Sequence, residues 1–278
     1  MGLTLAIANQ KGGVGKTATA VNLGAALALD GFRVLLIDLD SQGSATSGLG
    51  EEVVRGSSSY EVLIGELEAK VAARATSIEK LDLIGGTRDL AGAEVELVSY
   101  PDRQSRLSER LAPVRDCYDY ILIDCPPSLG MLTLNALCAA DAVVVPLQCE
   151  FYALEGLGAL IDTLERVRAA FHPNLRILGI LLTMYDARTS LSRQVVREVR
   201  QHFGEKVLRS MVPRNVRIGE SPSYGLPVVT YDPSSSGAVA YRNAAREIEE
   251  MTAASAASAS ESENNTVNTE KLDETAVG

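Results

Sequence analysis

The sequence predicts an α/β fold in which a mostly parallel, twisted sheet is flanked by helices on both faces. Short apolar segments alternate with helical patterns along the chain, and segments such as 33–38 are apolar without alternation. A strand buried on both faces has this pattern, and parallel strands need crossover connections, which are usually helices. Because ligands of such sheets bind beyond the carboxyl ends of the strands, functional residues are expected just after them.

Six strands and an N-terminal helix are expected from these patterns. The strands lie at 3–8, 33–38, 81–85, 118–124, 141–147 and 175–183. A Gly-rich turn follows the first strand, and residues 17–30 then form an Ala-rich helical stretch. Gly31 is expected to end that helix, since glycine readily adopts the left-handed conformation found after a helix C-terminus.

The composition fits one large domain followed by a tail. The 278 residues are 46% hydrophobic and 22% charged, which is enough for one sizeable core. We expect a domain over 1–250 and a disordered, acidic and polar tail over 251–278, where large apolar residues almost vanish. Its five acids and one lysine contribute −4 to the net charge of −10, so the domain is only mildly acidic.

Membrane insertion, export and a disulfide framework are not expected. No apolar run reaches the roughly 18 to 20 residues of a membrane helix, and the N-terminus lacks a basic segment before its short apolar run. A cytoplasmic location is therefore predicted. The cysteines show no Cys-x-x-Cys spacing, which favours reduced, buried thiols over a metal or redox site. They are Cys117, Cys125, Cys138 and Cys149.

A phosphate-binding loop is predicted between the first strand and the first helix, where the sequence reads KGGVGKT over 11–17. Glycines let the backbone wrap an anion closely, with N–H groups and the helix N-terminus pointing at the phosphates. A plain turn before a helix would not need the Gly-Lys-Thr sequence. Lys16 is expected at the β and γ phosphates, and the Thr17 hydroxyl on Mg²⁺. The predicted ATP-binding residues are Lys11, Gly12, Gly13, Val14, Gly15, Lys16, Thr17 and Ala18.

This loop departs from the standard pattern in two ways. Gln10 stands where the first glycine is usual, and an additional lysine, Lys11, follows it. The loop resembles the deviant Walker A motif of the ParA/MinD class of P-loop ATPases. In that class the additional lysine reaches across a nucleotide-sandwich dimer to the partner's phosphates, so the resemblance implies an ATP-dependent homodimer.

Carboxylates at two strand ends suit metal and water chemistry. Asp38 and Asp40 are two residues apart after the second strand, hence on the same side of an extended segment. One carboxylate near the phosphates can orient the attacking water, and Asp40 is the expected one. The family motif likewise implies a water role for Asp40 and a magnesium-side role for Asp38, although Ser41 stands where the family commonly has proline.

Asp124 ends the apolar strand at 118–124 and is similar to a Walker B aspartate. It is expected to hold Mg²⁺ through a water, because Mg²⁺ keeps several waters and takes few protein carboxylates. An isolated strand-end aspartate is more often a helix cap or a turn former. The phosphate loop and the Asp38-x-Asp40 pair favour the metal role. The predicted catalytic residues are therefore Lys11, Lys16 and Asp40, and the metal residues are Thr17, Asp38 and Asp124.

The resemblance to chromosomal ParA proteins of the Soj type extends over about residues 1–250, through stretches such as QGSATSGLG, DCPPSLGMLTLNAL and VPRNVRIGESPS. It implies a cytoplasmic, nucleoid-associated ATPase that loads onto nonspecific double-stranded DNA as an ATP dimer. A ParB/Spo0J-like centromere-binding protein would release it by stimulating hydrolysis. Pro213 and Asn215 match the family's loop near adenine, whereas Ala18 replaces its usual second threonine.

An arginine-rich segment supports DNA binding. Residues 188–217 contain eight basic residues against two acidic ones, an excess of six. Arg193, Arg197 and Arg200 are spaced to share one helical face, opposite an apolar face. Such a stripe neutralises phosphates without reading bases, but it can also be a merely solvated face. Among Soj-type proteins, arginines matching Arg188 and Arg217 are implicated in DNA contact, which favours the DNA interpretation.

Three alternatives compete with this hypothesis. A membrane-cycling ATPase similar to MinD needs a basic amphipathic C-terminal helix, whereas this tail is acidic and polar. An electron-transfer ATPase related to nitrogenase reductase needs paired cluster ligands, and Cys125 has no clear matching cysteine. A scaffold without hydrolysis is disfavoured because all the expected phosphate and acid residues are present.

Overall fold

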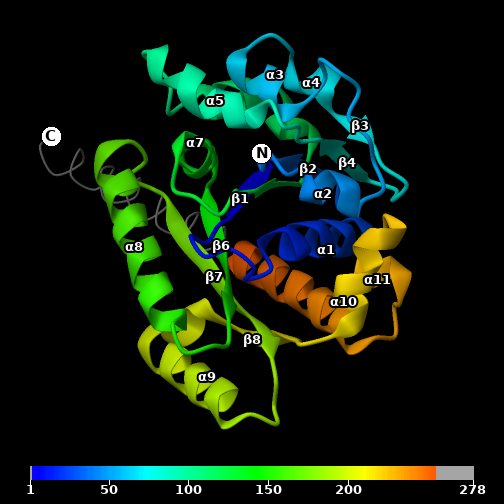
Figure 1. Ribbon diagram of the computed structural model, residues 1–278, viewed down its shortest axis with the longest axis vertical. Coiled ribbons are helices and arrows are strands. Elements are labelled where there is room, and N and C mark those ends of the chain that lie inside the picture. The colour runs from blue at the N-terminus through cyan, green and yellow to red at the C-terminus, as the bar shows by residue number, and fades with distance from the viewer. Residues whose placement is uncertain (1, 255–278) are drawn as a thin grey trace, which may run out of the picture.

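The computed structural model describes residues 2–254, in which the strands form one eight-stranded sheet (Figure 1). The strands are β1 Leu3–Ile7, β2 Val34–Asp38, β3 Arg74–Ala75, β4 Leu81–Ile84, β5 Tyr120–Asp124, β6 Ala142–Gln148, β7 Arg176–Tyr185 and β8 Val207–Pro213. Their order is β3-β4-β2-β5-β1-β6-β7-β8, and every neighbouring pair is parallel except β3 with β4. The predicted α/β class, with its mostly parallel sheet, is confirmed.

Helices cover both faces of the sheet. The α-helices are α1 Lys16–Leu29, α2 Ser44–Gly48, α3 Ser59–Ile64, α4 Ala69–Ala72, α5 Leu90–Glu96, α6 Arg106–Leu111, α7 Met131–Ala139, α8 Ala153–Ala170, α9 Ser190–Phe203, α10 Val216–Glu220, α11 Val228–Tyr231 and the helical residues 236–254. Short 3₁₀ turns lie at Leu97–Ser99, Ala112–Cys117, Gly204–Lys206 and Ser221–Tyr224. Figure 1 shows α1 and α8 on opposite sides of the central strands.

Two cores, one on each face, explain the continuous apolar strands. Along β2, Leu35 and Ile37 face the core under α3 to α9, whereas Leu36 faces the core under α1, α11 and 236–254. All three side chains are almost fully buried. Side chains alternate between faces along a strand, so a strand covered on both sides needs apolar residues at every position. The uninterrupted apolar pattern therefore indicates that the strand lies in the centre of the sheet.

The six expected strands are all present, and Gly31 follows α1 with a positive φ of 106° as predicted. Two further strands were not predicted. β3 has only two residues, both exposed, at one edge of the sheet. β8 lies at the other edge, and the exposed Arg209 interrupts its apolar pattern. Edge strands lack one neighbour, so they do not need the apolar pattern by which the central strands were recognised.

The domain end predicted at residue 250 falls inside a helix, since residues 236–254 are helical. Met251 packs against the core on the α1 face, and the Thr252 hydroxyl oxygen lies 3.2 Å from the Tyr120 hydroxyl oxygen. The first residues of the predicted tail are thus part of the folded unit, and its remainder, 255–278, lies outside the described residues. No helix between residues 2 and 254 is long and apolar enough to span a membrane.

The four cysteines are free thiols, as expected, but they are not all buried. Cys125 and Cys149 are buried and Cys138 is half-buried, whereas Cys117 is exposed at the end of a 3₁₀ turn. Burial raises the pKa of the Cys125 thiol, and the neighbouring Asp124 carboxylate raises it further. Cys125 is therefore a poor nucleophile and a poor metal ligand, because both roles need the thiolate.

Replacing Tyr241 with alanine is expected to destabilise the fold by about 3 to 5 kcal/mol, because a large aromatic ring fills the core on the α1 face. Tyr241 is only 1% exposed, and its hydroxyl oxygen lies 3.5 Å from the Thr19 hydroxyl oxygen. Tyr241→Phe keeps the ring and should cost about 1 kcal/mol. Urea denaturation of both variants measures the difference. Equal losses would mean that the hydroxyl, and not ring packing, dominates.

Candidate active site

The loop between β1 and α1 is held in place by its glycine conformations and by hydrogen bonds to two neighbouring strands. Gly13 and Gly15 have φ values of 74° and 89°, a region that side chains with a Cβ rarely adopt. The Asn9 amide donates to the Pro146 carbonyl at 2.7 Å, and the Thr183 hydroxyl donates to the Val14 carbonyl at 2.8 Å. These bonds anchor the loop to β6 and β7, so its N–H groups keep their direction without a ligand.

Lys16 opens α1 and points back into the loop. Its side chain is almost fully buried, and Nζ donates to the Lys11 carbonyl at 3.2 Å. Burial lowers the pKa of Lys16, whereas the negative charge of Asp124 raises it. A phosphate oxygen can replace the carbonyl as an acceptor, so the ammonium is already aimed at the place where an anion would lie.

Asp38 and Asp124 are in-register partners at the ends of β2 and β5, and both are fully buried. Asp38 is satisfied by protein: it accepts from the Asp40 N–H at 3.1 Å and from the Thr46 N–H and hydroxyl at 2.9 and 2.8 Å. Neither carboxylate oxygen of Asp124 has a hydrogen-bond partner among the described residues. Burial raises the pKa of Asp124 well above its usual range, and Asp38 raises it further, while Thr17 and Lys16 oppose the shift.

These carboxylates fit a divalent cation, with unequal roles. A buried carboxylate without a partner is costly, and Mg²⁺ with its waters would compensate the charge of Asp124. Both Asp38 oxygens accept hydrogen bonds in the turn that follows β2, which suits a position beside the cation. The metal roles of Thr17, Asp38 and Asp124 stay predictions. Thr17 is half-buried at the start of α1, beside the loop.

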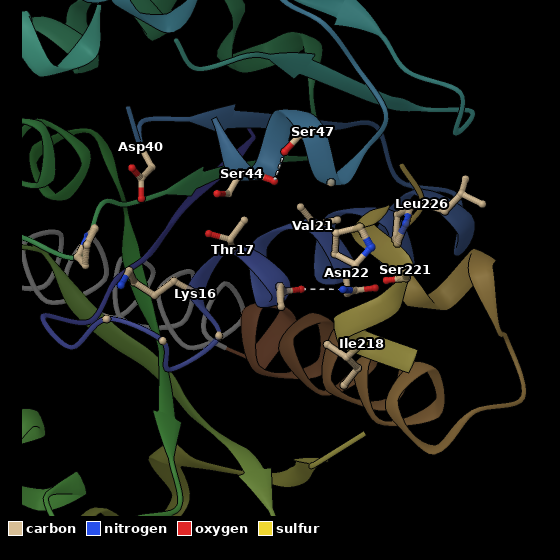
Figure 2. A pocket seen from close by; sticks show the side chains of 18 residues that line it. Lys16, Thr17, Val21, Asn22, Asp40, Ser44, Ser47, Ile218, Ser221 and Leu226 are labelled. Carbon is tan, nitrogen blue, oxygen red and sulfur yellow. Dashed lines mark hydrogen bonds between the residues drawn. The ribbon is translucent and has the colours of Figure 1, made fainter. Parts of the chain in front are cut away.

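Asp40 lies on the turn that Asp38 holds. Its Oδ1 accepts from the Gln42 N–H at 3.0 Å, and its carbonyl accepts from the Gly43 N–H at 2.9 Å. Ser41 therefore does not leave this turn open. In Figure 2, the Asp40 carboxylate lies at the same end of the pocket as Lys16 and Thr17. This is the region where an attacking water would be oriented.

A cavity of about 460 Å³ extends from the loop along α1 to the segment 218–227. Figure 2 shows a polar end with Lys16, Thr17 and Asp40 and a more apolar end with Val21 and Leu226. The full lining is Gly12, Gly13, Gly15, Lys16, Thr17, Ala18, Val21, Asn22, Asp40, Ser44, Ser47, Gly48, Pro127, Ile218, Ser221, Pro222, Leu226 and Pro227. The size is that of a small-ligand site, and its two ends match the phosphates and the base of a nucleotide.

The cavity gathers most of the predicted loop residues but not all. Val14 is buried beneath the loop, and Lys11 forms an ion pair with Glu150 instead of lining the cavity. Pro213 and Asn215 do not line it either. Asn215 caps α10 by accepting from the Arg217 N–H at 2.8 Å, and the cavity wall is formed further along the chain.

Sequence reasoning missed the wall that faces α1. Ile218 and Ser221 lie in the stretch VPRNVRIGESPS, where neither was given a role, and Leu226 lies just beyond it. The usable signal was two isolated apolar residues, Ile218 and Leu226, in an otherwise polar, Gly- and Pro-containing segment. Ser44 and Ser47, on α2, follow Asp40 closely and could have been predicted from that proximity.

The arginine stripe exists as a surface of α9. Arg193, Arg197 and Arg200 are exposed, while Val195 and Val199 are buried beneath them. None of the three forms an ion pair with a carboxylate in residues 2–254. The other two predicted DNA residues are compensated: Arg188 is paired with Asp186, and Arg217 is paired with Glu220 and Asp232. Among the five predicted DNA residues, those without a carboxylate partner in the described residues thus all lie on α9.

Comparisons with known proteins identify the family of this chain. A family model described as "AAA domain" matches residues 2–177. The chain is 53% identical over 249 residues to the "Sporulation initiation inhibitor protein Soj" of Bacillus subtilis, covering 89% of this chain and 98% of that protein. It is 55% identical over 247 residues to the "Chromosome partitioning protein ParA" of Caulobacter vibrioides, covering 88% and 92%. The chain belongs to the Soj/ParA family of P-loop ATPases.

A solved structure with a bound ATP analogue shares the fold of this chain. A Mycobacterium smegmatis protein described as cobyrinic acid a,c-diamide synthase, crystallised with an ATP analogue and magnesium, superposes with a TM-score of 0.79 at 41% identity. The match covers 88% of this chain and 93% of that one. The predicted family and enzyme class are therefore confirmed: the chain is a P-loop ATPase.

Magnesium binding to the ADP-loaded protein is expected to release protons and to weaken as the pH falls. The raised pKa of Asp124 means that its carboxyl takes up a proton at a higher pH than an ordinary aspartate does, and only the carboxylate attracts the cation. Calorimetric titration with Mg²⁺ in buffers of different ionisation enthalpy measures the protons released. Asp124→Asn should abolish this buffer dependence, and a wild-type heat that is independent of buffer would contradict the assignment.

Proposed function

We propose that this chain is an ATP-dependent DNA-segregation protein whose nucleotide state controls whether it binds nonspecific double-stranded DNA. The names of its relatives support a partitioning role, and the ATP analogue and magnesium in the Mycobacterium structure support Mg-ATP as the ligand. Here the loop amides and Lys16 would bind the phosphates, and Thr17 and Asp124 would hold Mg²⁺, which neutralises phosphate charge.

Hydrolysis is assigned to Asp40. Its carboxylate lies at the phosphate end of the cavity, on a turn fixed by Asp38, and can orient the attacking water or accept its proton. Asp38 acts through that turn. Lys16 stabilises the charge that develops on the transferred phosphoryl group.

Dimerisation is assigned to Lys11. Its side chain is 40% exposed and does not line the cavity of its own chain, although it is only five residues from Lys16. A lysine so close to the phosphate loop, yet directed elsewhere, suits the cross-subunit role that the deviant motif implies. Two chains bound face to face through ATP would each complete the other's site.

The DNA part of the proposal is carried by one observation: α9 presents Arg193, Arg197 and Arg200 to solvent without a carboxylate partner among residues 2–254. Guanidinium groups on one helical face neutralise phosphates without reading bases. A dimer presents two such faces, so its affinity rises through avidity and ATP binding becomes DNA binding. A ParB-type centromere-binding partner would end this state by stimulating hydrolysis, which accounts for cycling on the nucleoid.

DNA binding is expected only with ATP and should weaken steeply as salt increases, because neutralised phosphates release their counterions. The test is binding of the purified protein to a duplex of arbitrary sequence with ATP, with ADP and without nucleotide, across a salt series. Equal DNA binding with ATP, with ADP and without nucleotide would overturn the proposal that nucleotide state controls DNA binding. No binding in any state would overturn the DNA role and direct the next test to liposomes.

The double variant Arg193→Ala, Arg197→Ala should lower DNA affinity and flatten the salt dependence by about one unit of slope for each phosphate that is no longer neutralised. Arg55→Ala with Arg74→Ala is the matched control, since it removes the same charge, and Arg74 lies on β3 at the opposite edge of the sheet. Arg188→Ala and Arg217→Ala should act less strongly, because their carboxylate partners already offset their charge. Equal losses of DNA affinity in all variants would mean that net charge alone, and not the position of the arginines, causes the effect.

Lys11→Ala and Asp40→Ala should change dimer lifetime in opposite directions. Lys11→Ala is expected to remain monomeric with ATP, because the partner's phosphates lose a cation. Asp40→Ala is expected to accumulate as a long-lived ATP dimer, because hydrolysis falls while phosphate binding is kept. Light scattering during size-exclusion chromatography and phosphate release measure both. An Asp40→Ala variant that hydrolyses ATP at the normal rate would remove Asp40 from catalysis.

A further inference from the structure

The side chain of Lys11 is held inside its own chain by an ion pair with Glu150. Glu150 lies in the short connection between β6, which ends at Gln148, and α8, which begins at Ala153. The two residues are far apart in the sequence, yet β1 and β6 are neighbouring parallel strands, so their carboxyl ends bring them together. Neither residue lines the cavity.

Hydrogen bonds fix the backbone at both residues of this ion pair. Asn9 accepts from the Lys11 N–H at 3.0 Å through its side-chain oxygen and donates to the Pro146 carbonyl on β6 at 2.7 Å. On the other side, the Glu150 N–H donates to the Gln148 carbonyl at 2.8 Å, and the Glu150 carbonyl accepts from the Ala153 N–H at 3.1 Å. A single strand, β6, therefore fixes the backbone on both sides of the ion pair.

Releasing Lys11 has an electrostatic cost. Oε1 of Glu150 is shielded from solvent and has no hydrogen-bond partner among the described residues, so the Lys11 ammonium supplies its compensation. The Glu150 side chain is 29% exposed, so water compensates its carboxylate only in part once the Lys11 ammonium leaves. The lysine that would serve a second chain must first leave this carboxylate.

We propose that Glu150 is a positioning residue that holds Lys11 on its own chain and thereby sets the ATP and protein concentrations at which the dimer forms. The proposal rests on the ATP-dependent dimer of the proposed function. Glu150 competes with the partner's phosphates for one ammonium group. A chain without this competition would dimerise more readily, and an intact chain dimerises only when a triphosphate offers the stronger attraction.

The hydrogen bond between the two lysines links nucleotide binding to release. Lys16 donates to the carbonyl of Lys11, so the loop backbone at Lys11 is braced by the lysine that binds phosphate. When a phosphate attracts the Lys16 ammonium, the Lys11 carbonyl loses this hydrogen bond. Nucleotide in a chain's own cavity thus loosens the lysine that reaches for the partner.

The test compares Glu150→Gln with Glu155→Gln across a protein dilution series with ATP. Glu155→Gln removes the same charge, and Glu155 is exposed in the first turn of α8 and forms no ion pair with residues 2–254. Sedimentation is expected to show that Glu150→Gln dimerises at a concentration about threefold to tenfold lower than the wild type, while Glu155→Gln is unchanged. An unchanged or weaker Glu150→Gln dimer would overturn the proposal.

Two further measurements separate this role from other causes. In a Lys11→Arg background, where the charge is kept, Glu150→Gln should still promote dimerisation; in Lys11→Ala it should have no effect. Without nucleotide, Glu150→Gln should increase acylation of the Lys11 amine by an amine-reactive ester severalfold, as read by peptide mass spectrometry. Unchanged acylation overturns the positioning role even if no variant dimerises, whereas a wild type that stays monomeric with ATP overturns the proposed function instead.

Discussion

Two carboxylates buried side by side, at the ends of two central strands, impose the constraint on which the rest of the site depends. Asp38 and Asp124 are neighbours in register, and burial raises the pKa of both, while the charge of Asp38 raises the pKa of Asp124 further. An unpaired buried charge is among the most costly features a fold can contain. Hydrogen bonds from the turn and from Thr46 stabilise Asp38, whereas the charge of Asp124 is opposed by Lys16 and would be neutralised by the proposed cation. The turn that satisfies Asp38 is also the one that places Asp40.

The same strands join the phosphate loop to the surfaces that would meet partners. Thr183 on β7 binds the loop through the Val14 carbonyl, and three residues later Asp186 holds Arg188 at the start of the arginine-rich region. β6 leads to Glu150 and hence to Lys11. Strand β7 therefore connects the phosphate loop to the arginine-rich region proposed to face DNA. Strand β6 connects it to the lysine proposed to face the second chain. This arrangement gives nucleotide state a short physical route to each surface.

The sequence was sufficient where the chemistry is local. The phosphate loop over 11–17 and the aspartates at strand ends could be predicted because each depends on a few adjacent residues and on a buried strand before them. The role of Asp38 could not, since it follows from Thr46, which α2 brings back to the strand end. Ile218 and Leu226 reach the cavity only through the packing of α10 and the following segment near α1. The Lys11–Glu150 pair likewise depends on which strands are neighbours.

An open sheet of this size has two edges, and both are poor templates for another chain. β3 is only two residues long and antiparallel to β4, so it offers little exposed backbone. β8 carries the exposed Arg209 and ends at Pro213, and its register against β7 is irregular. Short, charged or irregular edges resist the addition of foreign strands. If the chain gathers on DNA as proposed, these edges let it reach a high local concentration without its sheets joining into aggregates.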